Sequence, residues 1–332
     1  MIILKERDVH SLLSDLSATE CHRLLTSLHD VLRAYSSAKD AALSEQTLHQ
    51  PERGSIVTRL GNTSLFMPSS VTTSTGIKIV TISPGGLKGC INVFAPEGDL
   101  LGLLNAEEVT AFRTALAVMI PYVRWPRSKK NIVVFGAGRQ AEWHVKLALL
   151  LSDVESITVV NRGTGRRMEQ LFADLGHRYP GVMFELLLRT SDDFDSRLRP
   201  LLAASDVIFC CTPATTPHFP SSYLGTKARF ISLIGSYKPS MQEVDSATLL
   251  SGDCIYVDTR EGCLAEAGEL INANVRGEQL VEIGQLRGVD PFTTNRSLIF
   301  KCVGMGIMDL VMASELLTMA QEKGLGVVIN DF

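Results

Sequence analysis

The segment from residue 131 to residue 151 constrains the fold of this chain more than any other. Four apolar residues, Ile132 to Phe135, run directly into Gly136-Ala137-Gly138-Arg139-Gln140-Ala141, and apolar residues at helical spacing follow from Trp143. The pattern predicts a buried strand, a glycine turn and a helix in immediate succession. Gly136 permits the tight turn, Gly138 leaves bare backbone where a phosphate can approach, and the helix start offers unpaired N–H groups. This order is typical of the first unit of a Rossmann-type, doubly wound parallel sheet that binds a dinucleotide. The residues expected at the pyrophosphate are Gly136, Ala137, Gly138, Arg139 and Gln140.

The end of the next predicted strand bears on which dinucleotide is bound. The apolar run Ile157 to Val160 ends at Asn161, where an acidic side chain would bind the ribose 2′-hydroxyl of NAD. The chain instead reads Asn161-Arg162-Gly163-Thr164-Gly165-Arg166-Arg167, with three arginines and no carboxylate. Because guanidinium groups bind phosphate through paired, charge-assisted hydrogen bonds, this stretch favours NADPH over NADH. We expect Asn161, Arg162 and Arg166 at the 2′-phosphate. The alternative for Arg166 and Arg167 is that they coat an exposed helix.

Composition excludes several classes of protein. The 332 residues suffice for two domains, and the net charge of −4 argues against a nucleic-acid surface. The longest apolar runs, such as Leu147 to Leu151, are too short to cross a bilayer, and the N-terminus lacks the order of a signal peptide. The seven cysteines include no Cys-x-x-Cys pair, so free thiols in a reducing cytoplasm are expected. The scattered histidines predict no metal site.

Two domains are expected along the chain. After a first short strand, Ser17-Ala18-Thr19-Glu20 forms a capping box that opens an amphipathic helix. Short alternating strands then predict a mostly antiparallel sheet, followed by a helix from Asn105 to Pro121. The strands are Ile56 to Leu60, Thr63 to Met67, Gly76 to Ile82, Cys90 to Phe94 and Leu100 to Leu104.

The chain turns polar and basic at residues 122–130, where we place the domain crossing. From there strands and helices alternate, which predicts a parallel sheet. The predicted strands lie near 131–135, 156–160, 182–187, 206–210, 229–233 and 253–257. The fold class is therefore α/β: residues 126–304 form a Rossmann NADP-binding domain. Residues 1–125, completed by a C-terminal helix in 305–332, form an α+β domain for substrate binding and dimerisation.

Several stretches together resemble the ornithine cyclodeaminase/mu-crystallin family over about residues 50–315. They are Ile77-Lys78-Ile79-Val80 followed by Pro84, Thr110-Ala-Phe-Arg-Thr-Ala115, Gly136-Ala-Gly-Arg-Gln-Ala-Glu-Trp-His144, Gly235-Ser-Tyr-Lys-Pro-Ser-Met-Gln-Glu-Val-Asp245 and Phe300-Lys-Cys-Val-Gly-Met-Gly-Ile-Met-Asp-Leu310. The resemblance implies a homodimer and an amino-acid-like ligand that faces the nicotinamide. It also implies that Arg113 and Lys78 hold the substrate carboxylate, with Arg53 as a looser match to a further arginine.

The residues alone leave both basic positions open. Arg113 lies on an otherwise apolar helix, where an arginine is either a surface residue with a buried stem or a buried clamp for an anion. Lys78 shares a strand face with Val80, opposite Ile77 and Ile79, and most lysines at such positions are solvated. The family motif favours the clamp at both positions.

One departure from the family separates two kinds of reaction. Cyclodeaminases carry an aspartate two residues after the glycine that Gly235 matches, and this chain has Tyr237 there. A phenol with an ordinary pKa near 10 is a poor substitute for a carboxylate base at neutral pH. Mu-crystallin-like ketimine reductases also lack the aspartate and prefer NADPH. Tyr237 either donates a hydrogen bond to the substrate beside Lys78 and Arg113 or forms a wall of the pocket. Thr212 and Val303 are expected near the cofactor.

These features predict an NADPH-dependent reductase of a small, cyclic imine or ketimine carboxylate, or the reverse dehydrogenation of an amino acid or amine. Two alternatives stay open at this point. One is a cyclodeaminase that releases ammonia from ornithine and recycles NAD internally. The other is a non-catalytic protein that binds a small ligand, as mu-crystallin-like relatives do.

Overall fold

The computed structural model describes residues 1–38, 46–164, 166–286 and 295–331. Its contacts divide the chain into two compact units. The first unit comprises Met1–Arg113 and Gly304–Phe332, and the second comprises Thr114–Val303. The sequence analysis placed the crossing at residues 122–130, whereas the units divide within a helix, α3 (Ala106–Arg124). That helix also continues one turn past Pro121, its predicted end, because the Pro121 carbonyl still accepts the Trp125 N–H at 3.0 Å.

The first unit is built on one sheet with the strand order β16-β1-β7-β6-β5-β4-β2, and β3 pairs with β4. Every pairing is antiparallel except that of β1 with β7, which confirms the mostly antiparallel sheet. Its strands are β1 (Ile2–Leu4), β2 (Leu48–His49), β3 (Gly54–Val57), β4 (Thr63–Val71), β5 (Ser74–Ser83), β6 (Gly86–Phe94), β7 (Leu100–Asn105) and β16 (Val327–Val328).

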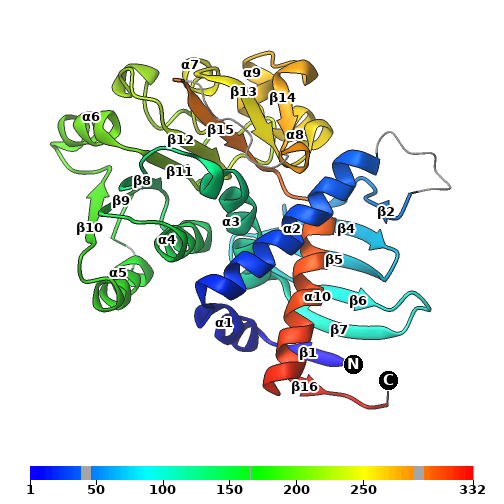
Figure 1. The fold of residues 1–332 in the computed structure, drawn as a ribbon. Coiled ribbons are helices and arrows are strands. Elements are labelled where there is room, and N and C mark those ends of the chain that lie inside the picture. Colours follow the sequence, from blue (N-terminus) through cyan, green and yellow to red (C-terminus); the bar gives the residue numbers. More distant parts are fainter. Residues whose placement is uncertain (39–45, 165, 287–294, 332) are drawn as a thin grey trace. The chain divides into compact units, whose positions relative to one another are not determined.

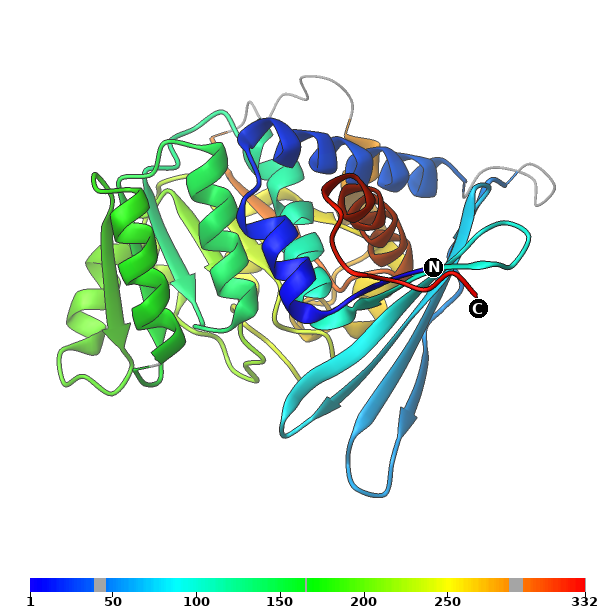
Figure 2. The ribbon, with the colours of Figure 1, turned by 90° about the horizontal axis from the view of Figure 1, so that it is seen from below.

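Helices cover one face of this sheet. The helices of the unit are α1 (Glu6–Ser14), α2 (Ala18–Ala38), the start of α3 and α10 (Gly306–Lys323), and α10 packs against β4, β5 and β6 (Figure 2). The predicted capping box is confirmed, since the Glu20 N–H donates to Ser17 Oγ at 3.2 Å and the Ser17 N–H to the Glu20 carboxylate at 2.8 Å. Gly76 and Gly102 let α10 approach closely, because a Cβ at either glycine would lie within 2.8 Å of a leucine side chain of α10.

The second unit is a parallel sheet with the strand order β10-β9-β8-β11-β12-β15-β13-β14 (Figure 1). The doubly wound fold predicted from the glycine turn is confirmed, and the six predicted strands are all present. The strands are β8 (Asn131–Phe135), β9 (Ser156–Asn161), β10 (Met183–Leu188), β11 (Val207–Cys210), β12 (Phe230–Leu233), β13 (Gly252–Val257), β14 (Leu280–Glu282) and β15 (Ser297–Lys301).

Two strands of this sheet, β14 and β15, were not predicted. β14 has three residues, and β15 has three apolar residues between Ser297 and Lys301, so neither carries a strong strand pattern. β15 also enters the sheet out of sequence order, between β12 and β13. The helices of the unit are α4 (Arg139–Leu151), α5 (Arg166–Arg178), α6 (Phe194–Ala204), α7 (Ser246–Leu249), α8 (Arg260–Glu266) and α9 (Gly268–Asn272), with short 3₁₀ turns η2 (Ser221–Tyr223), η3 (Gly277–Gln279) and η4 (Ile283–Gln285). Within the described residues, no helix combines the length and the apolar character needed to cross a membrane.

Candidate functional site

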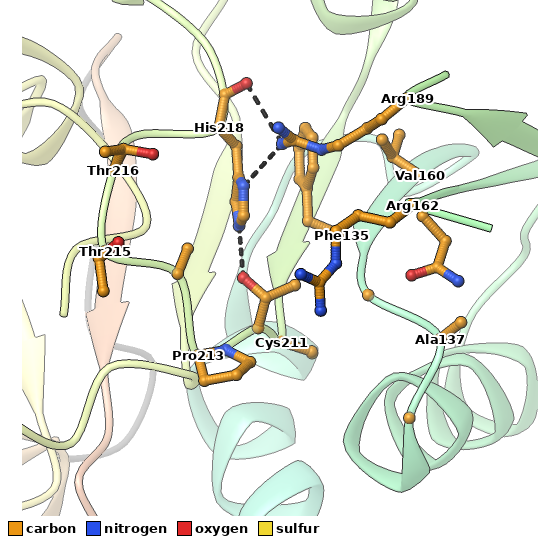
Figure 3. A pocket seen from close by; sticks show the side chains of 15 residues that line it. Phe135, Ala137, Val160, Arg162, Arg189, Cys211, Pro213, Thr215, Thr216 and His218 are labelled. Atoms are coloured by element: carbon orange, nitrogen blue, oxygen red, sulfur yellow. Dashed lines mark hydrogen bonds between the residues drawn. The ribbon is translucent and has the colours of Figure 1, made fainter. Parts of the chain in front are cut away.

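A cavity of about 430 Å³ opens at the carboxyl ends of β8, β9 and β11 in the second unit (Figure 3). β8 lies in the middle of the sheet, with β9 on one side and β11 on the other. This is the point where strand order reverses, and doubly wound sheets bind their ligands there. The cavity is lined by Phe135, Gly136, Ala137, Gly138, Val160, Asn161, Arg162, Arg189, Cys211, Thr212, Pro213, Ala214, Thr215, Thr216 and His218.

The glycine turn has the backbone geometry that the sequence predicts. Gly136 has φ of +107°, and a Cβ there would lie 2.9 Å from the Cys211 carbonyl oxygen. Gly138 is the N-cap of α4, so no side chain caps the first N–H groups of this helix. The position where a Cβ would lie is open space. Helix α4 therefore begins at the cavity, and no side chain fills the space in front of Gly138. A helix N-terminus with bare backbone in front of it suits a pyrophosphate.

The predicted 2′-phosphate residues lie at the edge of the same cavity. Asn161 ends β9 and donates its side-chain N–H to the Gly163 carbonyl at 2.7 Å, and exposed Arg162 follows it. The side chain of Arg166 lies outside the part of the chain that the structure describes. The residues that line the cavity include two arginines and no carboxylate. Cofactor phosphates thus fit the charge of this cavity as well as its backbone.

A polar network behind the cavity was not predicted. Arg189 donates to His218 Nδ1 at 2.7 Å, so the other ring nitrogen carries the hydrogen and donates to Thr212 Oγ1 at 2.6 Å. The Thr212 N–H donates to the fully buried Glu243 carboxylate at 2.8 Å, and the Gly235 N–H donates to its other oxygen at 2.7 Å. Thr212, predicted near the cofactor, is thereby fixed between two strand-end loops.

A second set of charges lies in the first unit. Lys78 on β5, Arg113 on α3 and Asp309 on α10 are each no more than 3% exposed. One Asp309 carboxylate oxygen is 2.7 Å from Lys78 Nζ, and the other accepts from Arg113 Nε at 2.9 Å. Two buried cations therefore share one carboxylate. We call these three residues the Lys78–Arg113–Asp309 cluster.

The strand and helix patterns explain how this cluster forms. Lys78 shares the helix-covered face of β5 with Gly76 and Val80, which excludes the alternative of a solvated lysine. The Arg113 guanidinium lies against Gly304, where φ is +87° and a Cβ would be 2.7 Å from its terminal nitrogens. Any other residue at Gly304 would therefore displace the guanidinium.

Burial changes the proton affinity of Lys78. Loss of solvent is the largest effect and, with the positive charges of Arg113 and Arg53, outweighs the stabilising charge of Asp309 and lowers the pKa of Lys78 to about 8. Arg53, the loosest of the predicted carboxylate residues, precedes β3 and is half-buried. Its effect on this pKa brings it into the electrostatic environment of the cluster.

A comparison with protein families matches residues 16–324 to the model described as the ornithine cyclodeaminase/mu-crystallin family. The chain belongs to this family. A protein of Saccharomyces cerevisiae named as uncharacterized is 31% identical over 96% of each chain. The Δ1-pyrroline-2-carboxylate reductase of Bacillus cereus is 28% identical and covers 94% of this chain and 98% of its own. The solved structure of the Thermococcus litoralis Δ1-pyrroline-2-carboxylate reductase, in complex with NADH and L-proline, has a TM-score of 0.82, with 21% identity over 99% of this chain and 100% of that one.

The remaining predicted residues of this family member lie on other loops of the second unit. Tyr237 follows β12, is half-buried and has Lys238 Nζ 5.6 Å from its ring centroid. The loop is fixed by Ser236, whose carbonyl accepts from buried Lys301 Nζ at 2.6 Å and whose hydroxyl donates to Glu269. Val303 follows β15 and donates its N–H to Asp258 at 3.2 Å. Neither Tyr237 nor Val303 lines the cavity.

Arg189 and Glu243 were not assigned from the sequence, and for Asp309 the sequence left open whether it faces the active site or caps local backbone. Asp309 belongs to a motif that was recognised, but its partner Arg113 is 196 residues away in sequence. Arg189 directly follows β10, as Arg162 directly follows β9, and the strand predicted at 182–187 ends two residues before it, so its place at the carboxyl edge of the sheet could have been found. His218 does not follow the end of a strand, so its sequence context offers no comparable signal.

Proposed function

We propose that this chain is an NADPH-dependent reductase of a small, cyclic imine or ketimine carboxylate, which also catalyses the reverse oxidation of the corresponding amino acid. The observation that carries the proposal is the Lys78–Arg113–Asp309 cluster. Lys78 and Arg113 are both buried and share the Asp309 carboxylate, and a pair of buried cations binds an anion through charge-assisted hydrogen bonds. A substrate carboxylate supplies that anion.

Arg113 and Lys78 bind the carboxylate of the substrate, and Arg53 adds long-range attraction. Asp309 orients both cations from one side, because each of its oxygens faces one of them. Gly304 leaves room for the guanidinium to lie flat against the backbone. This arrangement fixes the anionic end of a small substrate, so that its C=N bond takes one orientation.

Lys78 also holds a proton that the reaction consumes. Reduction of a C=N bond adds a hydride to carbon and a proton to nitrogen. The ammonium of Lys78, with its pKa of about 8, keeps its proton at neutral pH yet gives it up more readily than an ordinary lysine. Lys78 Nζ is therefore our proton donor to the imine nitrogen.

The second unit binds the cofactor. The start of α4 with Gly136, Ala137, Gly138, Arg139 and Gln140 binds the pyrophosphate, and Asn161 and Arg162 bind the 2′-phosphate. When bound, the nicotinamide supplies the hydride. The absence of carboxylates from the cavity lining and the arginines in it favour NADPH over NADH. Thr212 touches the cofactor, Val303 lies near the nicotinamide, and Tyr237 forms a wall of the substrate pocket.

The names of the relatives support the same reaction. The Bacillus cereus and Thermococcus litoralis proteins are both named for the reduction of Δ1-pyrroline-2-carboxylate, a cyclic imine carboxylate, and the second holds NADH and L-proline. The cyclodeaminase alternative lacks support in this chain, because Tyr237 stands where the family lyases have an aspartate. None of the seven cysteines, all of which lie in the described part of the chain, forms a disulfide, which is consistent with the proposed cytoplasmic enzyme.

We further propose that the active form is a homodimer that pairs through the face of the first-unit sheet opposite α10. The cross-strand register places apolar, partly exposed residues side by side on this face, which we call the outer sheet face. They are Ile56, Phe66, Ile77, Ile79, Leu101, Leu103 and Ile3. A contiguous apolar patch of this kind is typical of an interface between chains.

The proposal is tested by following the oxidation of NADPH by the purified chain with Δ1-pyrroline-2-carboxylate, larger cyclic imine carboxylates, α-keto acids with amines, and ornithine. We expect oxidation of NADPH with at least one imine carboxylate and formation of the cyclic amino acid. Release of ammonia from ornithine without net consumption of NADPH would show a lyase instead. Binding of NADPH with no turnover across the panel would show a ligand-binding protein.

A further inference from the structure

We propose that Arg189, held in place by His218, is a second guanidinium for the 2′-phosphate of the cofactor and sets the preference for NADPH. This inference rests on the proposed function, because it concerns the same cavity. It assigns a role to two residues that no sequence pattern marked for this purpose.

The strand register places Arg189 beside Arg162. β9 and β10 run in parallel, and Leu188 pairs with Asn161 as the last residue pair of the two strands. The Arg189 N–H donates to the Asn161 carbonyl at 2.8 Å, so the backbone of the two strand ends stays paired up to this point. Arg162 and Arg189 are thus neighbours on adjacent strands, and both side chains reach into the same cavity (Figure 3).

Three contacts fix the Arg189 side chain. Its guanidinium carbon lies 5.8 Å from the ring centroid of Phe135 and 5.7 Å from that of Phe194, and its Nη2 donates to His218 Nδ1 at 2.7 Å. His218 in turn stacks on Phe135 with ring centroids 4.7 Å apart and donates to Thr212. A guanidinium that is already immobilised loses little side-chain entropy when it binds an anion. Arg189 is therefore pre-organised, whereas Arg162 is exposed.

The charges around Arg189 call for an anion. Burial is the main cause that lowers the pKa of Arg189, and the positive charge of Arg162 lowers it further. Cys210 and Asp195 act on this pKa in the opposite direction, and neither residue lines the cavity. Two guanidinium groups side by side bind a phosphate dianion with several charge-assisted hydrogen bonds. The 2′-phosphate is the group that distinguishes NADPH from NADH at this end of the site.

The experiment measures binding rather than turnover, with two nucleotides that differ only in the 2′-phosphate. Isothermal titration of the full chain with 2′,5′-ADP (adenosine 2′,5′-bisphosphate) and with 5′-AMP gives the ratio of their affinities. We expect the wild type to bind 2′,5′-ADP more tightly. Arg189→Ala should weaken the binding of 2′,5′-ADP by about 10-fold or more and change the binding of 5′-AMP by no more than about 3-fold.

Two further variants separate positioning from folding. His218→Phe keeps the ring on Phe135 but cannot accept from Arg189, so it should lower the affinity ratio by a smaller factor than Arg189→Ala. Arg178→Ala removes an exposed arginine of α5 outside the cavity and should leave the ratio unchanged. Thermal unfolding of each variant confirms that the second unit is intact.

The outcomes distinguish this inference from the proposed function. If the wild type itself does not favour 2′,5′-ADP, the NADPH preference fails together with the role of Arg189. If the wild type favours 2′,5′-ADP but Arg189→Ala keeps the ratio, only the role of Arg189 fails. If Arg189→Ala weakens both nucleotides equally, Arg189 contacts the adenosine that they share and not the 2′-phosphate.

Discussion

Lys78 is the residue where burial and charge act on the chemistry most directly. Its ammonium is almost without contact with solvent, yet it lies 2.7 Å from the Asp309 carboxylate. Burial disfavours the charged form of Lys78, and the ion pair with Asp309 favours it. Because the effect of burial is larger, the pKa of Lys78 is lowered to about 8. An ordinary lysine would stay charged to about pH 10.

This balance predicts a pH dependence. In the proposed mechanism, Lys78 below pH 8 is an ammonium group that attracts the carboxylate and can donate a proton to the imine nitrogen, and above pH 8 it is a neutral amine that does neither. The steady-state kcat/KM with an imine carboxylate should therefore fall about tenfold per pH unit above about pH 8. Lys78→Arg keeps its charge to far higher pH, so its lower activity should stay level across this range.

Lys88→Arg is the matched control, because Lys88 is an exposed lysine on the neighbouring strand β6. Its pH profile should follow that of the wild type. An identical loss of activity above pH 8 in Lys78→Arg would show that another group titrates, and the role of Lys78 would be withdrawn.

At the scale of single elements, the two glycines of the turn between β8 and α4 differ in whether the backbone requires them. Gly136 needs its positive φ and has a carbonyl oxygen 2.9 Å from the position of a Cβ. Gly138 has φ of −89° and open space at that position. Only Gly136 is required by the backbone of the protein itself, and in the proposed site Gly138 leaves room for the pyrophosphate.

Gly138→Ala should therefore separate stability from binding. We expect the free energy of unfolding to change by no more than about 1 kcal/mol, since Ala is tolerated at an N-cap at that cost. The Kd for NADPH, measured by fluorescence titration, should rise about tenfold or more because the methyl group occupies the space of the phosphate. Gly181→Ala, at another open glycine of the second unit, should change neither quantity. Unaltered NADPH binding by Gly138→Ala would place the pyrophosphate elsewhere.

Helix α4 also carries a buried histidine whose protonation opposes folding. His144 Nδ1 lies 2.6 Å from the Gln140 carbonyl oxygen, and burial lowers the pKa of His144 to about 4 from an ordinary value of 6.5. Between pH 6.5 and pH 4, His144 binds a proton in the unfolded chain but stays neutral in the folded chain. The contribution of His144 to stability is thus fully present above pH 6.5 and declines as the pH falls towards 4, by about 1.4 kcal/mol per unit.

His144→Leu should remove this decline. Urea unfolding between pH 6.5 and pH 4 should show a shallower loss of unfolding free energy in His144→Leu than in the wild type. His177→Leu, which changes an exposed histidine of α5, should keep the slope of the wild type. Equal slopes in all three proteins would mean that His144 takes up its proton in the folded chain as well.

The elements themselves were largely predictable, and the pairing of side chains between distant elements was not. Local patterns found the strand, glycine turn and helix at residues 131–151 because all the relevant contacts lie within one stretch of chain. Arg113 and Lys78 were recognised only through the family motif, since burial of a cation cannot be read from its neighbours in sequence. Asp309 orients both Lys78 and Arg113 through its two carboxylate oxygens. The contact between Arg189 and His218 depends on how two loops that are separate in sequence come together.

At the scale of the whole molecule, the outer sheet face predicts assembly. Ile79 lies in its middle, with Phe66 and Cys90 as its cross-strand neighbours. Ile79→Lys should place a charge in the interface of the proposed dimer and give a monomer in sedimentation or light scattering, whereas the wild type should have twice the mass of one chain. Thr26→Lys, on the exposed side of α2, is the control and should remain dimeric. A monomeric wild type, or a dimer that survives Ile79→Lys, would remove this face as the interface.

The central claim is that Arg113 holds the carboxylate of an imine substrate, and one comparison tests it most directly. It measures kcat/KM of the wild type and of Arg113→Ala with Δ1-pyrroline-2-carboxylate and with Δ1-pyrroline, which lacks the carboxylate. Arg113→Lys, which keeps a charge for Asp309, guards against loss of folding. We predict that Arg113→Ala loses about 100-fold or more on the carboxylate substrate, and only a few-fold on the ring without it. An equal loss on both substrates, or none on either, would contradict the account.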